Sequence, residues 1–314
     1  GNAMYWRWSG YRDRSGIRVM VEIRKVAVIG AGVMGAGIAA QIANAGVPVH
    51  LLDIVPDGSD DRDAIAEGAI ARLLKTDPAP LMHKRNAKLI TPGNIEDHME
   101  RLADCDWIIE AVIENLTIKR NLYERIAAVR RNDAVLSSNT STIPLKELTE
   151  GMDGSLRRYF LIMHFFNPPR YMRLFELVAG SDTEAGVSET IRSFADISLG
   201  KTVIDAKDTP GFIANRIGTY WLQCAVVEAM DGGVDIETAD AAIGRPFGIP
   251  KTGAFGLLDL VGLDLMPHVL SSLQGALPKE DPFHAIHREP ELLTRMIKDG
   301  YTGRKGKGGF YRLN

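Results

Sequence analysis

The hydrophobic and polar positions of this chain follow two different patterns, which change near residue 207. Before that position, short apolar runs rich in Val, Ile and Leu recur, with polar or helix-like stretches between most of them. Strands that alternate with helices predict a mostly parallel sheet with helices on both faces. The predicted strands are the runs at 25–30, 48–53, 107–112, 134–138, 159–166, 174–178 and 202–206.

Residues 56–98 interrupt this alternation. The run DRDAIAEGAIARLLK has helical spacing, and the prolines of DPAP end it. The pattern predicts a pair of helices that project from the sheet.

After Asp208-Thr209-Pro210-Gly211 the strand-like runs stop, and longer helical patterns begin at 212–230, near 235 and at 292–298. We therefore predict an all-helical second domain over 208–314. Residues 1–20 have no usable period, so we expect a tag or a disordered leader there, with Met20 as suitable a native start as Met4.

Composition narrows the classes of protein. The chain has 314 residues, of which 45% are hydrophobic and 25% charged, as in a globular protein of about two domains. Its net charge of −3 and the lack of a basic block give no reason to expect a nucleic-acid partner. No apolar run approaches the roughly 20 residues of a membrane span. Two cysteines, Cys105 and Cys224, exclude a disulfide framework and favour the cytoplasm.

A glycine motif, G-x-G-x-x-G over residues 30–35, follows the first predicted strand and opens a helix, and Asp53 stands eighteen positions later. This context predicts a Rossmann-type domain over 21–207 that binds NAD, because the loop admits a pyrophosphate and the carboxylate binds the ribose 2′-hydroxyl. The alternative is a Gly-rich turn with a capping Asp. The predicted loop contacts are Gly30, Gly32, Val33, Met34, Gly35 and Asp53.

His164 lies inside the apolar run at 159–166. Such a histidine is usually a core residue whose hydrogen bonds are satisfied. Here Asn167 and two prolines end the strand at the rim of the predicted sheet, where ligands bind. Glu176 follows after a turn and a short strand, so it could return beside the imidazole and raise its basicity. A nicotinamide site needs a base for an alcohol proton, and His164 is the candidate.

Two polar groups accompany His164. The cluster at 137–141 follows another predicted strand, where it can meet a ligand or cap the helix of PLKEL, and both can hold at once. Asn215 lies on the first helix after the domain boundary.

Several motifs occur in the order typical of one family: VAVIGAGVMGAGIA, IIEAVIENLTIK, SNTSTI, MHFFNPPRYMRLFELV, AKDTPGFIANRI, LLDLVGLD and GGFY. From about residue 24 to its end the chain resembles the L-3-hydroxyacyl-CoA dehydrogenases of fatty-acid β-oxidation, with a weaker match over 54–100. Some sequence segments are similar to those of the long bacterial members, which continue into an enoyl-CoA hydratase module. The chain is therefore expected to be part of such a bifunctional protein or a shorter member.

The resemblance implies a role for each matching residue. His164 is the catalytic base, Glu176 orients it, and Ser141 and Asn215 position the substrate oxygen and the imidazole. On the cofactor side the implied residues are Glu114, Lys119, Asn167 and Lys305. The implied reaction is NAD-dependent oxidation of an L-3-hydroxyacyl-CoA to the 3-oxoacyl-CoA, without a metal. Two alternatives are a dehydrogenase of a free hydroxy or sugar acid and a non-catalytic NAD-binding protein.

The first helix of the second domain predicts a homodimer. Its apolar residues cover more than one stripe, and a helix that is apolar most of the way round needs several partners. These residues are Phe212, Ile213, Ile217, Trp221, Leu222, Val226, Val227 and Met230. The resemblance also implies a dimer through this domain. The alternative is that later helices, around 254–274 and 290–299, cover the first one.

The first prediction concerns the cofactor. Asp53 is followed by six positions without a basic residue, so its carboxylate would repel the 2′-phosphate of NADP in a partly desolvated site. We expect a higher kcat/KM with NAD than with NADP, and a narrower preference in Asp53→Ala. Comparable kcat/KM values for both cofactors in the wild-type protein would refute the prediction.

Overall fold

The structure, a computed structural model, describes residues 22–249 and 252–312. The predicted leader over 1–20 lies outside the described residues. The chain divides into two compact units, residues 1–209 and residues 210–314, where the sequence pattern had placed a boundary near 207.

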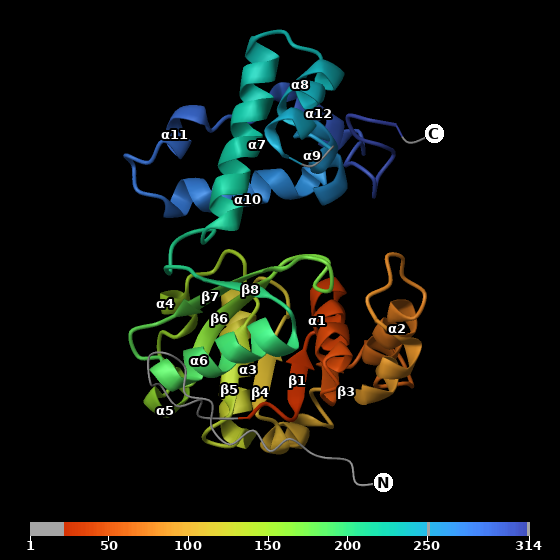
Figure 1. Cartoon of the computed structure of the whole chain (residues 1–314), viewed down its shortest axis with the longest axis vertical. Coiled ribbons are helices and arrows are strands. Elements are labelled where there is room, and N and C mark those ends of the chain that lie inside the picture. The colour runs from red at the N-terminus through yellow and green to blue at the C-terminus, as the bar shows by residue number, and fades with distance from the viewer. Residues whose placement is uncertain (1–21, 250–251, 313–314) are drawn as a thin grey trace. The chain divides into compact units, whose positions relative to one another are not determined.

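The first unit is built on an eight-stranded sheet with the order β3-β2-β1-β4-β5-β6-β7-β8 (Figure 1). Neighbouring strands are parallel except β6 and β7, which are antiparallel. The predicted fold, a mostly parallel sheet with helices around it, is confirmed. The strands are β1 (Val26–Ile29), β2 (Val49–Asp53), β3 (Ile90–Asn94), β4 (Trp107–Glu110), β5 (Val135–Ser138), β6 (Phe160–Phe165), β7 (Leu174–Ala179) and β8 (Thr202–Asp205).

Helices cover both faces of this sheet. On one face, alternate strand residues such as Val28, Trp107 and Met163 join a core with α1 and α6. The opposite face carries α3, whose Tyr123 ring packs edge-on against Phe160 at 5.3 Å between centroids. The helical segments are α1 (Val33–Asn44), α2 (Ala64–Leu73), η1 (Lys84–Leu89), η2 (Met99–Asp104), α3 (Leu116–Val129), α4 (Leu145–Leu148), α5 (Gly154–Arg157), α6 (Ala185–Ser193) and the π-helical turn η3 (Phe194–Ser198).

The prediction of a helical pair over 56–98 is wrong in its second half. The helix α2 is present, but a short 3-10 turn and the strand β3 follow it, and β3 pairs in parallel with β2. Pro92 and Gly93 in β3 hide the strand from sequence reasoning, because both residues weaken sheet pairing. Proline is tolerated here because β3 is the edge strand of the sheet.

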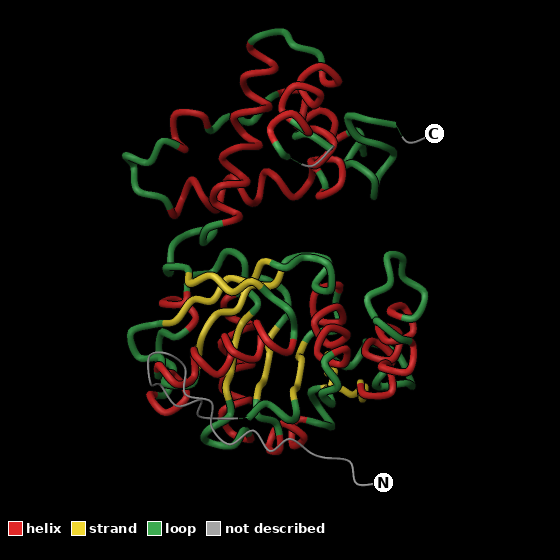
Figure 2. The backbone as a smooth tube through the Cα atoms, in the orientation of Figure 1, coloured by secondary structure: helices red, strands yellow, loops and turns green. Residues whose placement is uncertain are grey.

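The second unit consists of helices and loops, as predicted (Figure 2). Leu222 and Val226 of its longest helix pack in one core with Phe255, Leu270 and Phe283. The helices are α7 (Ala214–Asp231), α8 (Ile236–Ile243), η4 (Arg245–Phe247), α9 (Phe255–Val261), η5 (Leu263–Leu265), α10 (Met266–Ala276), α11 (Phe283–Ile286) and α12 (Glu291–Lys298). Across the described residues no single helix could cross a membrane; α9 with the following helical stretch to Ala276, a bent pair, meets only the length and composition criteria.

The strand order places a ligand crevice in the first unit. From β1 the chain continues to β2 and β3 on one side, then crosses to β4, β5 and β6 on the other. In such sheets a ligand binds beyond the carboxyl ends of the strands, where the order reverses, here between β1 and β4. The glycine motif follows β1 directly, so the fold brings it to this position.

Candidate active site

The glycine loop packs tightly between β1, α1 and the end of β4. Gly30 has φ of +104°, and a Cβ there would lie 2.4 Å from the carbonyl oxygen of Ala111. A Cβ on Gly35 would lie 1.7 Å from the oxygen of Gly30, so both positions require glycine. A Cβ on Gly32 would meet no atom within 4 Å. The helix α1 starts there without a side-chain cap or an acidic residue in its first turn, and its backbone N–H groups suit a phosphate.

Asp53 is fixed at the end of β2 beside this loop. Its Oδ2 accepts a hydrogen bond from the backbone N–H of Ala31 at 2.5 Å, and its Oδ1 accepts one from Ile54 at 2.7 Å. Three apolar side chains follow the neighbouring strands and are exposed: Val33 (76%), Ile54 (57%) and Ile113 (66%). The carboxylate of Asp53 and exposed apolar surface therefore lie along the same edge of the sheet.

His164 and Glu176 stand directly opposite each other on the antiparallel strands β6 and β7. The distance from His164 Nδ1 to Glu176 Oε2 is 2.7 Å, and both residues are buried, with 6% and 0% exposure. An ionised carboxylate can only accept hydrogen bonds, so beside an ionised Glu176 the Nδ1 of the imidazole is the donor of this bond. The ring of Phe166 lies 4.4 Å from the imidazole, between centroids. The sequence prediction that Glu176 returns beside His164 is met by this register.

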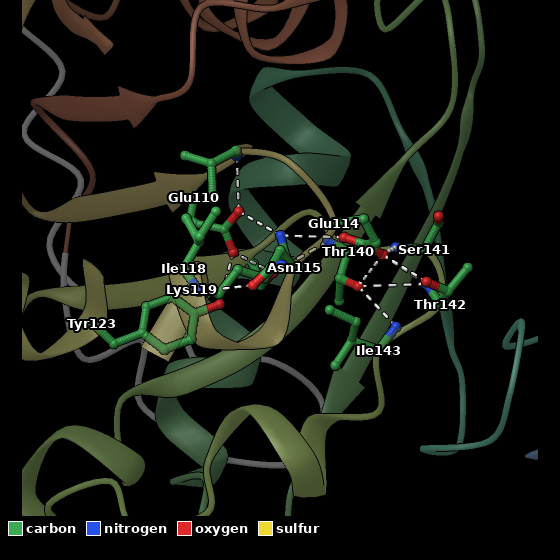
Figure 3. Close-up of polar contacts among 12 residues, drawn as sticks. Glu110, Glu114, Asn115, Ile118, Lys119, Tyr123, Thr140, Ser141, Thr142 and Ile143 are labelled. Carbon is green, nitrogen blue, oxygen red and sulfur yellow. Dashed lines mark hydrogen bonds and ion pairs between the residues drawn. The ribbon is translucent and has the colours of Figure 1, made fainter. Parts of the chain in front are cut away.

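The loop after β5, which carries Ser141, is held by Glu114 (Figure 3). Glu114 Oε1 accepts hydrogen bonds from the Thr140 hydroxyl at 2.5 Å and from the backbone N–H groups of Ser141 and Thr142 at 3.0 Å. Burial acts to raise the pKa of Glu114, but the Lys119 ammonium at 3.3 Å and these donors outweigh it and lower the pKa. Glu114 therefore stays ionised and fixes the loop.

Lys119 lies beneath this loop and is 1% exposed. Its ammonium donates to Glu110 Oε1 at 2.6 Å, and Glu110 is itself fully buried (Figure 3). Glu110 also accepts from the Val112 N–H at 2.9 Å, the Tyr123 hydroxyl at 2.7 Å and the Ser138 hydroxyl at 2.6 Å. The contacts of Lys119 thus run to carboxylates, and its predicted contact with the cofactor stays a prediction.

Asn167 lies at the border of a cavity of about 350 Å³ in the first unit. The start of α1, with Gly32 and Val33, and the end of α2, with Arg72, form other walls. The structure thus places Asn167 at the same cavity as the glycine loop, and its role toward the cofactor stays a prediction.

The amino-acid sequence matches two family models in succession. Residues 25–209 match the 3-hydroxyacyl-CoA dehydrogenase NAD binding domain, and residues 211–313 match the 3-hydroxyacyl-CoA dehydrogenase C-terminal domain. The chain belongs to the 3-hydroxyacyl-CoA dehydrogenase family. Its first unit corresponds to the NAD binding domain of this family.

Several known proteins are similar to this chain over 93% of its residues. A putative fatty acid oxidation complex trifunctional enzyme of Rickettsia felis is 45% identical, and the chain spans 41% of its length. A probable 3-hydroxyacyl-CoA dehydrogenase of Deinococcus radiodurans is 41% identical, with 83% of its length covered. The solved (S)-3-hydroxybutyryl-CoA dehydrogenase of Ralstonia eutropha is 30% identical, covered over its whole length, with a TM-score of 0.75.

Two predicted site residues belong to the second unit of the chain. Asn215 is the second residue of α7, and Lys305 is exposed in the loop between Gly303 and Gly308, which are joined by an isolated β-bridge. Their roles toward substrate and cofactor stay predictions.

Two residues that hold the site, Glu110 and Asn139, were not predicted from the sequence. Asn139 Oδ1 accepts from the backbone N–H of Phe165 at 3.0 Å, which ties the loop after β5 to the residue next to His164. The signal for Glu110 was present, since a carboxylate inside an apolar strand needs a partner. The signal for Asn139 was the polar cluster in which it stands.

The second prediction tests the carboxylate under the loop. Glu110→Gln leaves the buried Lys119 without its nearest negative charge, and breaking a buried ion pair costs about 3–5 kcal/mol. We expect a fall of that size in the free energy of unfolding, measured in denaturant. Glu124→Gln, at an exposed site on α3, the helix that carries Lys119, serves as the control and should change stability by less than about 0.5 kcal/mol. Equal stabilities of the two variants would contradict the assignment.

Proposed function

We propose that this chain oxidises an L-3-hydroxyacyl-CoA to the 3-oxoacyl-CoA with NAD. The observation that carries the proposal is the buried His164–Glu176 pair on the NAD-binding sheet of a 3-hydroxyacyl-CoA dehydrogenase family member. A buried imidazole with an oriented tautomer is a suitable general base for an alcohol.

The reaction removes a hydride and a proton from the substrate. NAD, when bound, supplies the hydride acceptor. Nε2 of His164 takes the proton of the C3 hydroxyl. The C3–O single bond becomes a C=O double bond as the hydride leaves C3. The imidazolium that forms is stabilised by Glu176 at 2.7 Å in surroundings with little water. Ser141 and Asn215 are assigned to hold the substrate oxygen and the imidazole.

The residues of the first unit fit NAD. The N-terminus of α1 lacks a side-chain cap, so its N–H groups can donate hydrogen bonds to the pyrophosphate. Asp53, held by two backbone donors, is assigned to the ribose hydroxyls. We assign the exposed apolar side chains of Ile54 and Ile113 to the adenine ring, because an aromatic base removes such surface from water.

The substrate class can be tested against its alternative. A solved dehydrogenase of 29% identity and TM-score 0.65 is named for a pyridine carboxylic acid, a substrate without CoA. Comparison of kcat/KM for a 3-hydroxyacyl-CoA thioester and for the matching free acid separates the two classes. A higher value for the free acid would overturn the thioester assignment.

The third prediction concerns the base. His164→Ala should retain NAD affinity and lose about 10²–10⁴-fold in turnover, the usual contribution of a general base. Glu176→Gln should also be slower, because it keeps a hydrogen bond but loses the charge that supports the imidazolium. His83→Ala, which removes an exposed imidazole from the same unit, is the control and should match the wild type. Turnover of His164→Ala within threefold of wild type would remove it from the mechanism.

We also propose a homodimer formed through the second unit. Part of the apolar surface of α7 is covered within the unit, where Leu222 and Val226 pack against later helices, as the alternative required. Other apolar side chains of the unit are exposed, among them Ile217 (64%), Leu260 (48%) and Leu265 (44%). Exposed apolar side chains of this kind support an isologous contact with a second copy.

The fourth prediction is the mass in solution. Light scattering at micromolar concentration should give twice the chain mass of 34.4 kDa. Leu265→Glu should give the single-chain mass without loss of NAD binding, whereas Met82→Glu, at an exposed apolar residue of the first unit, should stay dimeric. A wild-type mass near 34.4 kDa would contradict the proposed dimer.

A further inference from the structure

A second buried lysine lies outside the contacts described so far. Lys201 is 2% exposed and stands between Gly200, with φ of +65°, and the start of β8. Its ammonium donates hydrogen bonds to the carbonyl oxygen of Pro169 and, at 2.8 Å, to that of Met172. Both acceptors belong to the loop between β6 and β7, which begins two residues after His164.

The surroundings of Lys201 contain no described carboxylate partner. Burial alone lowers the pKa of Lys201, to about 8. The ammonium also contacts the ring of Phe165, with Nζ 5.4 Å from the ring centroid. A buried ammonium without a counter-ion costs free energy, and an apolar side chain of similar size would fill the same space at lower cost. The two carbonyl contacts are therefore what distinguishes lysine from methionine at this position.

The loop that Lys201 holds is tightly constrained on its other side. The carbonyl oxygen of Pro168 accepts hydrogen bonds from the N–H groups of Tyr171 and Met172, both at 3.0 Å. The ring of Pro169 contacts α1, since a Cβ on Gly37 would lie 2.9 Å from Pro169 Cδ. Pro169 is thus in contact with the ammonium and with the helix that follows the glycine loop.

The position of Lys201 is itself fixed from α1. Gln41, 4% exposed on that helix, donates from Nε2 to the carbonyl oxygen of Leu199 at 2.9 Å. The backbone N–H of Lys201 donates to Ala195 at 2.9 Å. A continuous set of polar contacts therefore runs from α1 through residues 199–201 to the loop after β6.

We propose that Lys201 is a positioning residue that holds the loop after β6 against α1. The loop carries Asn167, which borders the 350 Å³ cavity together with Gly32 and Val33. The ammonium of Lys201 contacts the backbone of the loop and not Asn167 itself. We therefore assign Lys201 an indirect effect on the reaction, through the placement of Asn167. The kinetic consequence rests on the proposed dehydrogenase function, whereas the structural consequence does not.

The test compares Lys201→Met, which keeps the length of the side chain and removes the donor, with the wild-type protein. Hydrogen exchange of a peptide over 166–173 should be faster in the variant, at the amides of Tyr171 and Met172, with unchanged exchange in β1. With 3-hydroxybutyryl-CoA and NAD, kcat per NAD-binding site should fall about tenfold to a hundredfold, because a small misplacement near the reacting atoms has effects of that size. The KM for the thioester should stay within threefold.

Lys146→Met, at an exposed lysine of the same unit, is the control and should match the wild type in exchange and kcat. Unchanged loop exchange and unchanged kcat in folded Lys201→Met would overturn the inference. Should that variant not fold, Lys201→Gln replaces it in the test. Its shorter N–H donor should also give faster loop exchange and a lower kcat than the wild type, and no change in either would overturn the inference. A wild-type protein that binds NAD but does not turn over any 3-hydroxyacyl-CoA would end the proposed function, and the loop exchange would still decide the role of Lys201.

Discussion

The site depends on one electrostatic requirement: a carboxylate removed from water must be surrounded by hydrogen-bond donors. Glu110 and Glu176 are both fully buried, and they meet this requirement in different ways. Glu110, at the end of β4, collects four donors from the loop after β4, from α3 and from β5, and so connects the strand that borders the glycine loop to the strand that precedes Ser141. Glu176 contacts the imidazole of His164, the proposed base, at Nδ1. Stability and chemistry thus rest on the same kind of contact.

The sequence predicted those parts of the site whose partners are close in the chain. The glycine motif needs only the adjacent strand and helix, and the β6–β7 hairpin brings His164 and Glu176 together over twelve residues. The strand β3 was missed because its Pro and Gly are tolerated only at a sheet edge, which is a property of the assembled sheet. The role of Lys201 was missed because its acceptor, Pro169, is 32 residues away and carries no side-chain signal.

The two buried lysines fix neighbouring loops by different means. Lys119 lies between Glu110 and Glu114, and Glu114 holds the loop after β5. Among the described residues, Lys201 has backbone carbonyls as its acceptors, and both belong to the loop after β6. An ammonium suits both positions because it offers three donors on a long apolar stem, which reaches a loop from within the core. Both loops border the carboxyl ends of the strands, where the fold places its ligands.

The strand period of two explains why the polar residues of the site meet. Residues such as Trp107, Ile109 and Phe165 join the core on the α1 side, so the residues between them face α3. This set includes Glu110, Ser138, His164 and Glu176, each at or near a strand end on the carboxyl edge. A slip of one residue between β6 and β7 would turn Glu176 to the other face and leave His164 opposite an apolar side chain. The apolar alternation that builds the core therefore also fixes the register of the His164–Glu176 pair, and packing on the α1 side contributes to the geometry of the proposed base on the α3 side.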